Sequence, residues 1–224
     1  MLKIFLTCLV FYFSNEALAN ANPYFEGNII SPNLLDEPTA EGHEKEIKEI
    51  IELQNNLTSD EITQASKEYA ITPETLIKEV RPDLNRSEYP HLYHLLDRSE
   101  ETALNTKDLI KSYWKSPRPY QISKDVKLFT KASSNNSYPS GHTTRGYTMA
   151  YILGLLIPEK RSDFLLVTKQ LTEHRILVGE HFPSDLKAGR RLAFIVIGGL
   201  LQNSDFQKDF TAAKKELAAH QSNS

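Results

Sequence analysis

The stretch from His91 to Trp114 constrains the fold most, because it contains neither proline nor glycine. Its apolar residues recur on one side at helical spacing, at Leu92, Leu95, Leu96, Ala103, Leu109 and Ile110. The pattern predicts one long helix with an apolar face. Pro117 and Pro119 follow, and they must end this helix because proline lacks a backbone N–H and restricts the residue before it.

Several shorter segments carry helix start and stop signals. Ser59 can cap a helix within residues 58–70, and Pro73 suits the first position of another helix, after Thr72. Later helices are expected from about Gly141 to Ile157, from Ser162 as N-cap to a stop at Gly179, from about Pro183 to Leu201, and over residues 205–220. Strand signals are nearly absent, so the sequence predicts an all-α helical bundle.

One part of this pattern is apolar on every side. Residues 192–201 read LAFIVIGGLL. A helix that is apolar all round is expected to be buried, so this stretch predicts the central helix of the bundle. The run is too short to span a membrane.

The length and net charge of the chain limit its domain organisation and the kinds of ligand that it can bind. Its 224 residues suit an extended arm over residues 20–40, rich in asparagine and proline, followed by a single helical domain over residues 41–224. The net charge of -3 gives no sign of the basic stripe that a nucleic-acid-binding surface needs. The oligomeric state is left open, and a homo-oligomer is compatible with the sequence.

The first residues are expected to form a secretory signal peptide, residues 1–19. The chain starts with MLK, continues with the apolar run IFLTCLVFYF, and offers Ala17 and Ala19 as the small residues of a cleavage site. We therefore expect a periplasmic or secreted protein with no membrane span after cleavage, and a retained anchor is the alternative. Cys8 lies in this segment, so cleavage would leave a chain without cysteine and without disulfides.

Three short stretches combine residue types that suit phosphate chemistry. They are Lys111 with Arg118-Pro119, the run Pro139-Ser140-Gly141-His142, and Arg175 with His181 and Asp185. Taken singly, each has an ordinary interpretation. The first would be solvated charge at a helix end, the second a turn before a helix, and the third a loop histidine with an acid in the following first turn.

Together the three stretches supply what phosphoryl transfer requires. Arginine and lysine neutralise a phosphate, and arginine binds its oxygens in fork geometry. Where a helix begins at Ser140 and Gly141, free backbone N–H groups make an anion site. Two histidines can divide the acid–base and nucleophilic work. Asp185 can accept a hydrogen bond from one ring nitrogen of His181 and leave the other as a lone-pair nucleophile.

The order and spacing of the stretches, Lys-x6-Arg-Pro, Pro-Ser-Gly-His and Arg-x5-His-x3-Asp, resemble the signature of the phosphatidic acid phosphatase type 2 superfamily. Over residues 85–220 the chain is most similar to the bacterial class A non-specific acid phosphatases. The resemblance implies the helical fold shared by acid phosphatases and vanadium haloperoxidases. It also implies hydrolysis of small phosphomonoesters through a phosphohistidine, with no cofactor and no metal.

The resemblance also implies a role for each matching residue. His181 would be the nucleophile, Asp185 would orient it, and His142 would be the general acid. The phosphate would be held by Lys111, Arg118, Ser140, Gly141 and Arg175. One position departs from the family pattern, because His174 stands where a serine is usual. We expect His174 to lie near the pocket rim and to modulate substrate preference and pH dependence.

Alternatives stay open beside this interpretation. They are a vanadium haloperoxidase, a lipid phosphate or diphosphate phosphatase of the same superfamily, and a non-enzymatic anion-binding protein. A metal site of His174, His181 and Asp185 is disfavoured, because the cations of the same pocket would repel a divalent ion. The remaining histidines, His43, His91, His94 and His220, are interpreted as ordinary surface or packing residues.

Overall fold

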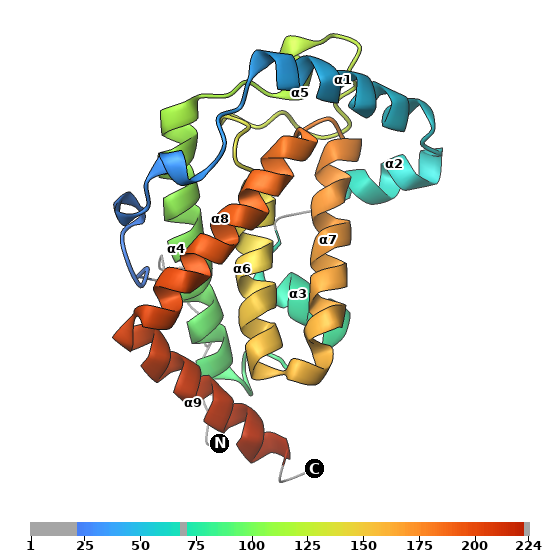
Figure 1. The fold of residues 1–224 in the computed structure, drawn as a ribbon. Helices are drawn as coiled ribbons and strands as arrows, with labels where there is room; N and C mark the ends of the chain where they lie inside the picture. The colour runs from blue at the N-terminus through green and yellow to red at the C-terminus, as the bar shows by residue number, and fades with distance from the viewer. Residues whose placement is uncertain (1–21, 68–70, 222–224) are drawn as a thin grey trace, which may run out of the picture.

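The computed structural model describes residues 22–67 and 71–221 (Figure 1). Within these ranges the regular structure is entirely helical, as the sequence predicts. The expected signal peptide lies outside the described residues. The described part of the N-terminal arm contains two short 3-10 turns, Gly27–Ile29 and Pro32–Leu34, before α1 begins at Ala40.

The long helix predicted from the proline-free stretch is α4, which spans Pro90–Trp114. Lys115 follows it in the left-handed conformation, with φ of 50°, so the chain leaves the helix before Pro117. The apolar face of α4 packs against α6 and against the C-terminal helix α9, Ser204–Gln221. The prediction of a long amphipathic helix is therefore confirmed.

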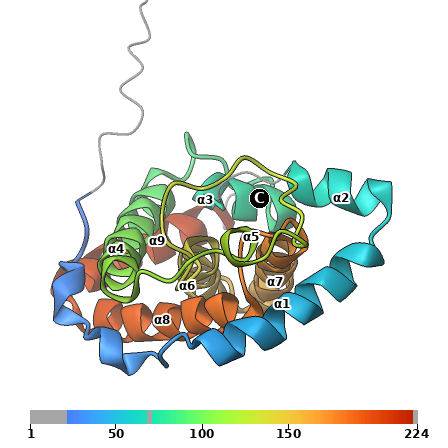
Figure 2. The same ribbon diagram turned by 90° about the horizontal axis from the view of Figure 1, so that it is seen from above.

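The central helix of the bundle is α6, Gly141–Leu156. In both views it lies between α4 and α7, Arg161–Leu177, with α8, Pro183–Gln202, along one side and α3, Pro73–Val80, on the other (Figures 1 and 2). The expectation that residues 192–201 form the buried central helix is wrong. On α8 the side chains of Phe194 and Leu201 are 50% and 46% exposed.

The buried position of α6 depends on threonines that satisfy their own hydroxyl groups. Thr144 donates to the carbonyl oxygen of Ser140 at 2.9 Å, and Thr148 donates to that of Thr144 at 2.9 Å. A buried hydroxyl with such a partner escapes the cost of an unsatisfied polar group. This is why α6 can occupy the centre despite its threonines, while α8, whose first half carries charged residues, lies at the side.

The remaining helix ends differ slightly from the expected ones. Thr58, not Ser59, caps α2 (Ser59–Ser66), because its side chain accepts from the N–H of Glu61 and its own N–H donates to the Glu61 carboxylate. Helix α7 begins at Arg161 after a 3-10 turn, Pro158–Lys160, so Ser162 is not its cap. Other predicted signals hold, since Thr72 caps α3 with Pro73 first, and Gly179 follows α7 with φ of 78°.

The arrangement brings four helix ends together. Helices α4 and α7 end, and α6 and α8 begin, at the same end of the bundle, at the top of Figure 1. The segment that carries α5, Pro119–Ile122, crosses this end, and α1, Ala40–Asn55, lies beside it (Figure 2). Among the described helices, none has both the length and the apolar character that a membrane crossing requires.

Candidate active site

A pocket of about 170 Å³ lies at this end of the bundle. It is lined by Leu104, Lys107, Lys111, Arg118, Ser133, Asn135, Gly141, His142, Arg145, Arg175 and His181. The pocket brings together residues from all three stretches that the sequence singled out, although these are far apart along the chain. Ser140 and Asp185 lie behind the wall as buried supports.

His181 and Asp185 form the contact that their spacing predicts. His181 lies in the loop between α7 and α8, and Asp185 lies in the first turn of α8. Nδ1 of His181 is 2.9 Å from Oδ2 of Asp185. An ionised carboxylate only accepts, so Nδ1 carries the proton and Nε2 keeps a lone pair. Nε2 is 3.4 Å from Nη1 of Arg118.

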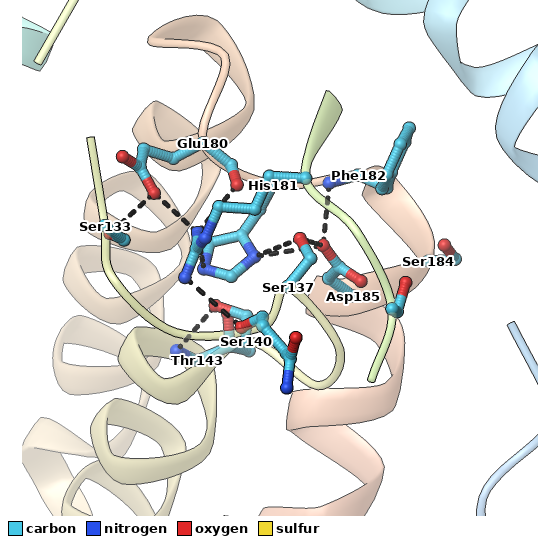
Figure 3. A network of polar contacts seen from close by, with 12 residues as sticks. Ser133, Ser137, Ser140, Thr143, Glu180, His181, Phe182, Ser184 and Asp185 are labelled. Atoms are coloured by element: carbon cyan, nitrogen blue, oxygen red, sulfur yellow. Dashed lines mark hydrogen bonds and ion pairs between the residues drawn. The ribbon is translucent and has the colours of Figure 1, made fainter. Parts of the chain in front are cut away.

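The Asp185 carboxylate is fixed by two further donors (Figure 3). Ser137 donates to Oδ2 at 2.5 Å, and the backbone N–H of Phe182 donates to the same atom at 2.9 Å. Complete burial raises the pKa of the Asp185 carboxyl, and these two hydrogen bonds oppose that rise. The geometry fixes the orientation of the His181 ring.

The surroundings of His181 keep its ring neutral. Burial, followed by the charges of Arg118 and Lys111, holds the pKa of His181 well below its usual range. A neutral imidazole with its Nδ1–H bonded to a carboxylate has an available lone pair on Nε2. His181 therefore has the protonation state and the tautomer that a nitrogen nucleophile needs.

Lys111 is a buried cation in the last turn of α4. Its Nζ donates to the carbonyl oxygens of Asn136 and Ser137, the latter at 2.7 Å. Burial, and then the charge of Arg118, lowers the pKa of Lys111 to about 7. An anion in the pocket would favour the charged form of this lysine.

Arg118 is held rigidly by groups from two loops. Nε donates to the carbonyl oxygen of Asn135 at 2.9 Å, and Nη2 donates to its side-chain oxygen at 2.7 Å. Nη1 donates to the carbonyl oxygen of Glu180 at 2.8 Å and to its carboxylate at 2.5 Å. Ser133 also donates to that carboxylate, at 2.8 Å (Figure 3). Glu180 is therefore the buried counter-ion of a predicted phosphate-binding arginine.

The start of α6 forms one wall of the pocket. Ser140 is its N-cap, and the Ser140 hydroxyl accepts from the N–H and the hydroxyl of Thr143 at 3.4 and 3.0 Å. The N–H of Ser140 donates to the carbonyl oxygen of Asp185 at 3.0 Å, which ties α6 to α8. Within the described chain, the N–H groups of Gly141 and His142 have no hydrogen-bond partner. These two groups suit an anion at the helix start.

The first two residues of α6, Gly141 and His142, lie close to positively charged side chains of the pocket. A Cβ atom on Gly141 would lie 2.9 Å from Cδ of Lys107, so any other residue at this position would displace the Lys107 side chain. Burial, followed by the charges of Arg145 and Arg175, holds the pKa of His142 well below its usual range. His142 is thus neutral in the ligand-free pocket, and a bound dianion would raise its pKa by countering those charges.

Helix α1 packs against the residues that follow His181. The ring of His43 stacks on Phe182, the neighbour of His181, with centroids 4.2 Å apart. Glu46 accepts from the N–H and the hydroxyl of Ser184, both at 2.7 Å. His43 is buried, so its interpretation as a packing residue agrees with the structure.

Of the two remaining predicted residues, Arg175 lines the pocket and His174 does not. Arg175, in the last turn of α7, is buried and lines the pocket. His174 is partly exposed and is not among the lining residues, so its role as a modulator stays a prediction. In residues 22–67 and 71–221, no three histidine, cysteine or acidic side chains are grouped so that they could hold a metal ion.

Sequence reasoning missed several residues around the pocket, among them Lys107, Ser137, Arg145 and Glu180. Lys107 lies one helical turn before Lys111, and helical spacing could have pointed to it. Arg145 lies three residues after His142, which gives the same signal. Ser137 and Glu180 lie in loops, where no spacing rule predicts which side chains meet.

Comparison with known proteins gives consistent matches. Residues 102–208 match the PAP2 superfamily. An acid phosphatase of Zymomonas mobilis is 34% identical over 140 residues, 60% of this chain and 53% of that protein. A non-specific acid phosphatase of Providencia stuartii is 32% identical over 141 residues, 60% of this chain and 56% of that protein. A lipid A 1-phosphatase of Rhizobium johnstonii is 39% identical over 66 residues, 30% of this chain and 26% of that protein.

The chain thus spans about half the length of the acid phosphatases it matches. The superfamily match contains every predicted site residue from Lys111 to Asp185, and it runs from α4 into α9. The all-α architecture agrees with this assignment. The region of residues 102–208 belongs to the PAP2 superfamily.

Proposed function

We propose that this protein is a secreted acid phosphatase that hydrolyses phosphomonoesters through a phosphohistidine, without a metal. The observation that carries the proposal is the state of His181. Its Nδ1 is 2.9 Å from Asp185, and its ring lines a pocket that also contains Lys111, Arg118 and Arg175. A neutral nitrogen nucleophile inside a cluster of cations suits attack on a phosphate. The matched acid phosphatases support the same reaction class.

In the first step of the proposed mechanism, Nε2 of His181 attacks phosphorus. The N–P bond forms while the P–O bond to the alcohol breaks, and His142 donates a proton to the departing oxygen. Asp185 stabilises the positive charge that develops on the His181 ring. The cations and the N–H groups at the start of α6 stabilise the charge of the transferring group.

In the second step, water replaces the histidine. His142, now neutral, takes a proton from the water as the oxygen attacks phosphorus, and the N–P bond breaks. Inorganic phosphate leaves, and His181 returns to its starting state. The lowered pKa of His142 fits this second role, because the neutral ring is the base.

The pKa of His142 also bears on the pH range of the reaction. The first step needs His142 protonated, and the free pocket disfavours that form. Binding of a dianion opposes the cations, and acidic solution supplies the proton. Both effects favour activity below neutral pH.

The test is hydrolysis of phosphate esters by the purified protein with EDTA present. We expect release of phosphate from small monoesters, persistence of activity in EDTA, and inhibition by vanadate, which mimics the five-coordinate phosphoryl group. Loss of activity on chelation, restored by a divalent cation, would contradict the metal-independent mechanism. A lipid phosphate belongs in the same screen, because one relative is named a lipid A 1-phosphatase. Halide oxidation with vanadate and peroxide, without ester hydrolysis, would identify the haloperoxidase alternative.

We also propose export with cleavage after Ala19, on the basis of the apolar run and the small residues that follow it. The mass of the exported protein tests this proposal. A mature chain that starts at Asn20 is expected. An intact N-terminus in the membrane fraction would show the retained anchor instead.

A further inference from the structure

The pocket holds more positive charge than one phosphate group requires. Besides Lys111, Arg118 and Arg175, it is lined by Lys107 and Arg145. These two residues come from different helices, α4 and α6, and none of the roles assigned above uses them. Both lie beside the start of α6, where His142 stands.

Lys107 lies against the wall that Gly141 forms. Its side chain is only 8% exposed, and its Nζ lies 3.7 Å from the position that a Cβ atom of Gly141 would occupy. Its ammonium group pairs with the neighbouring Asp108, which is 58% exposed and extends toward solvent. The charge of Lys107 is therefore held inside the pocket by a partner at its edge.

Arg145 stands one helical turn after His142, on the same side of α6. Its side chain is 13% exposed and lies 3.4 Å from Glu100 of α4, from Nη1 to Oε1. Its Nε is buried and has no hydrogen-bond partner within the described part of the chain. A buried guanidinium with an unused donor, lining a pocket, has capacity for an anionic ligand.

The position of Arg145 separates it from the nucleophile. Among nearby charges, Arg145 has the largest effect on the pKa of His142, but it is not among the main influences on that of His181. Because Arg145 also follows His142 by one turn of α6, it lies near the proposed general acid, where the leaving alcohol departs. Lys107 lies closer to the nucleophile, since its charge lowers the pKa of His181.

We infer that Lys107 and Arg145 form a second anion subsite, which selects phosphate esters whose leaving alcohol carries a carboxylate or a second phosphate. This inference rests on the proposed phosphatase function and adds the substrate class. The transferred phosphate occupies the pocket of Lys111, Arg118 and Arg175, and the second anion reaches Lys107 and Arg145 past His142.

Glu100 regulates the strength of this subsite. It is the carboxylate that pairs with Arg145, and burial raises its pKa to about 7. An ionised Glu100 competes with a substrate anion for the guanidinium. Removing its charge should therefore strengthen the preference for a second anion, which is opposite to the effect of removing Arg145.

The experiment compares three esters that share a two-carbon alcohol. Ethyl phosphate has no second anion, phosphoglycolate has a carboxylate in place of the methyl group, and 1,2-ethanediol bisphosphate has a second phosphate. The measured quantity is the ratio of kcat/KM for each ester with a second anion to that for ethyl phosphate. We expect ratios of about ten or more for the wild-type protein, the size of a charge-assisted contact.

Substitutions of Lys107 and Arg145 test whether these residues cause the preference for esters with a second anion. Arg145→Gln and Lys107→Met, which keeps the stem that packs on Gly141, should each reduce the ratios about tenfold, and Glu100→Gln should raise them at neutral pH. Lys169→Met is the matched control, because Lys169 is 58% exposed on α7 and does not line the pocket. It should leave the ratios unchanged.

The outcomes for the second anion subsite and for the phosphatase function can be told apart. Ratios near one in the wild-type protein, or ratios that neither Arg145→Gln nor Lys107→Met changes, would overturn the subsite. If Arg145→Gln proves unfolded by circular dichroism, Arg145→Lys and Lys107→Met carry the test. Absence of hydrolysis of every ester would refute the proposed function instead, so the two failures are distinguishable. A preference limited to the bisphosphate would identify phosphate, and one limited to phosphoglycolate would identify carboxylate, as the second anion.

Discussion

The carboxylate of Glu180 accepts a 2.5 Å hydrogen bond from Nη1 of Arg118, and both side chains are buried beside His181. A buried charge that loses its partner destabilises a fold strongly, because its desolvation is no longer compensated. The pair therefore matters to stability as well as to the geometry of the pocket.

We predict that Glu180→Leu lowers the free energy of unfolding by about 3 kcal/mol. Urea denaturation followed by circular dichroism measures the change. The matched control is Glu173→Leu, which removes the partner of Lys169 in an exposed pair. Exposed pairs contribute about 1 kcal/mol or less, so the control should change little. Equal, small losses in both variants would contradict the structural role of Glu180.

A second prediction concerns the pH dependence of anion binding. The pKa of Lys111 is about 7, so its charged form prevails below that pH and is lost above it. Sulfate keeps a constant charge across this range and is therefore a suitable probe. We expect its affinity to weaken as pH rises from 6 to 9, because each unit above the pKa reduces charged Lys111 about tenfold. In the ligand-free pocket His142 and His181 do not titrate in this range, since their pKa values lie lower.

Isothermal titration calorimetry across this pH range measures the effect. The variants are compared in a Glu100→Gln background, because the pKa of Glu100 is also about 7 and this carboxylate pairs with Arg145. In that background Lys111→Arg keeps a charge that does not titrate and should give a flat profile. Lys111→Met should give a profile that is flat and weaker throughout. A wild-type profile without a break near pH 7 would show that Lys111 does not control anion affinity.

The third prediction compares two substrates, of which only one has a leaving group that needs a proton to depart. His142→Ala should reduce hydrolysis of ethyl phosphate by about 10²–10⁴-fold, the usual contribution of general acid catalysis. Hydrolysis of nitrophenyl phosphate should fall much less, because that leaving group departs without a proton. Steady-state kinetics with both substrates measures the difference. Equal losses for the two substrates would remove the proposed role of His142 as acid.

The sequence predicted which residues lie together at the end of the bundle, because its motifs fix local geometry. Pro183 starts α8 and places Asp185 in the first turn, within reach of His181. Ser140 and Gly141 start α6 and bring His142 to the pocket. Each of these contacts joins residues that are close in sequence, and a sequence motif describes such neighbouring residues.

The supporting contacts could not be predicted in the same way. Ser137 reaches Asp185 across 48 positions of sequence, and Glu180 reaches Arg118 across 62. Such contacts depend on how loops pack over the bundle end. The central helix was also misassigned, because the apolar run of residues 192–201 is only the second half of α8, and its first half carries charged residues.

Detection of phosphate on His181 is the most direct test of the proposed phosphohistidine mechanism. The protein is mixed with nitrophenyl phosphate, quenched in alkali, which preserves phosphohistidine, and digested for mass spectrometry. We predict a phosphate adduct on the peptide that contains His181. The adduct should increase in His142→Ala, because the base for the attacking water is missing, and His181→Ala should show neither adduct nor turnover. Turnover without any adduct, an adduct on another residue, or an active His181→Ala protein would contradict the phosphohistidine mechanism.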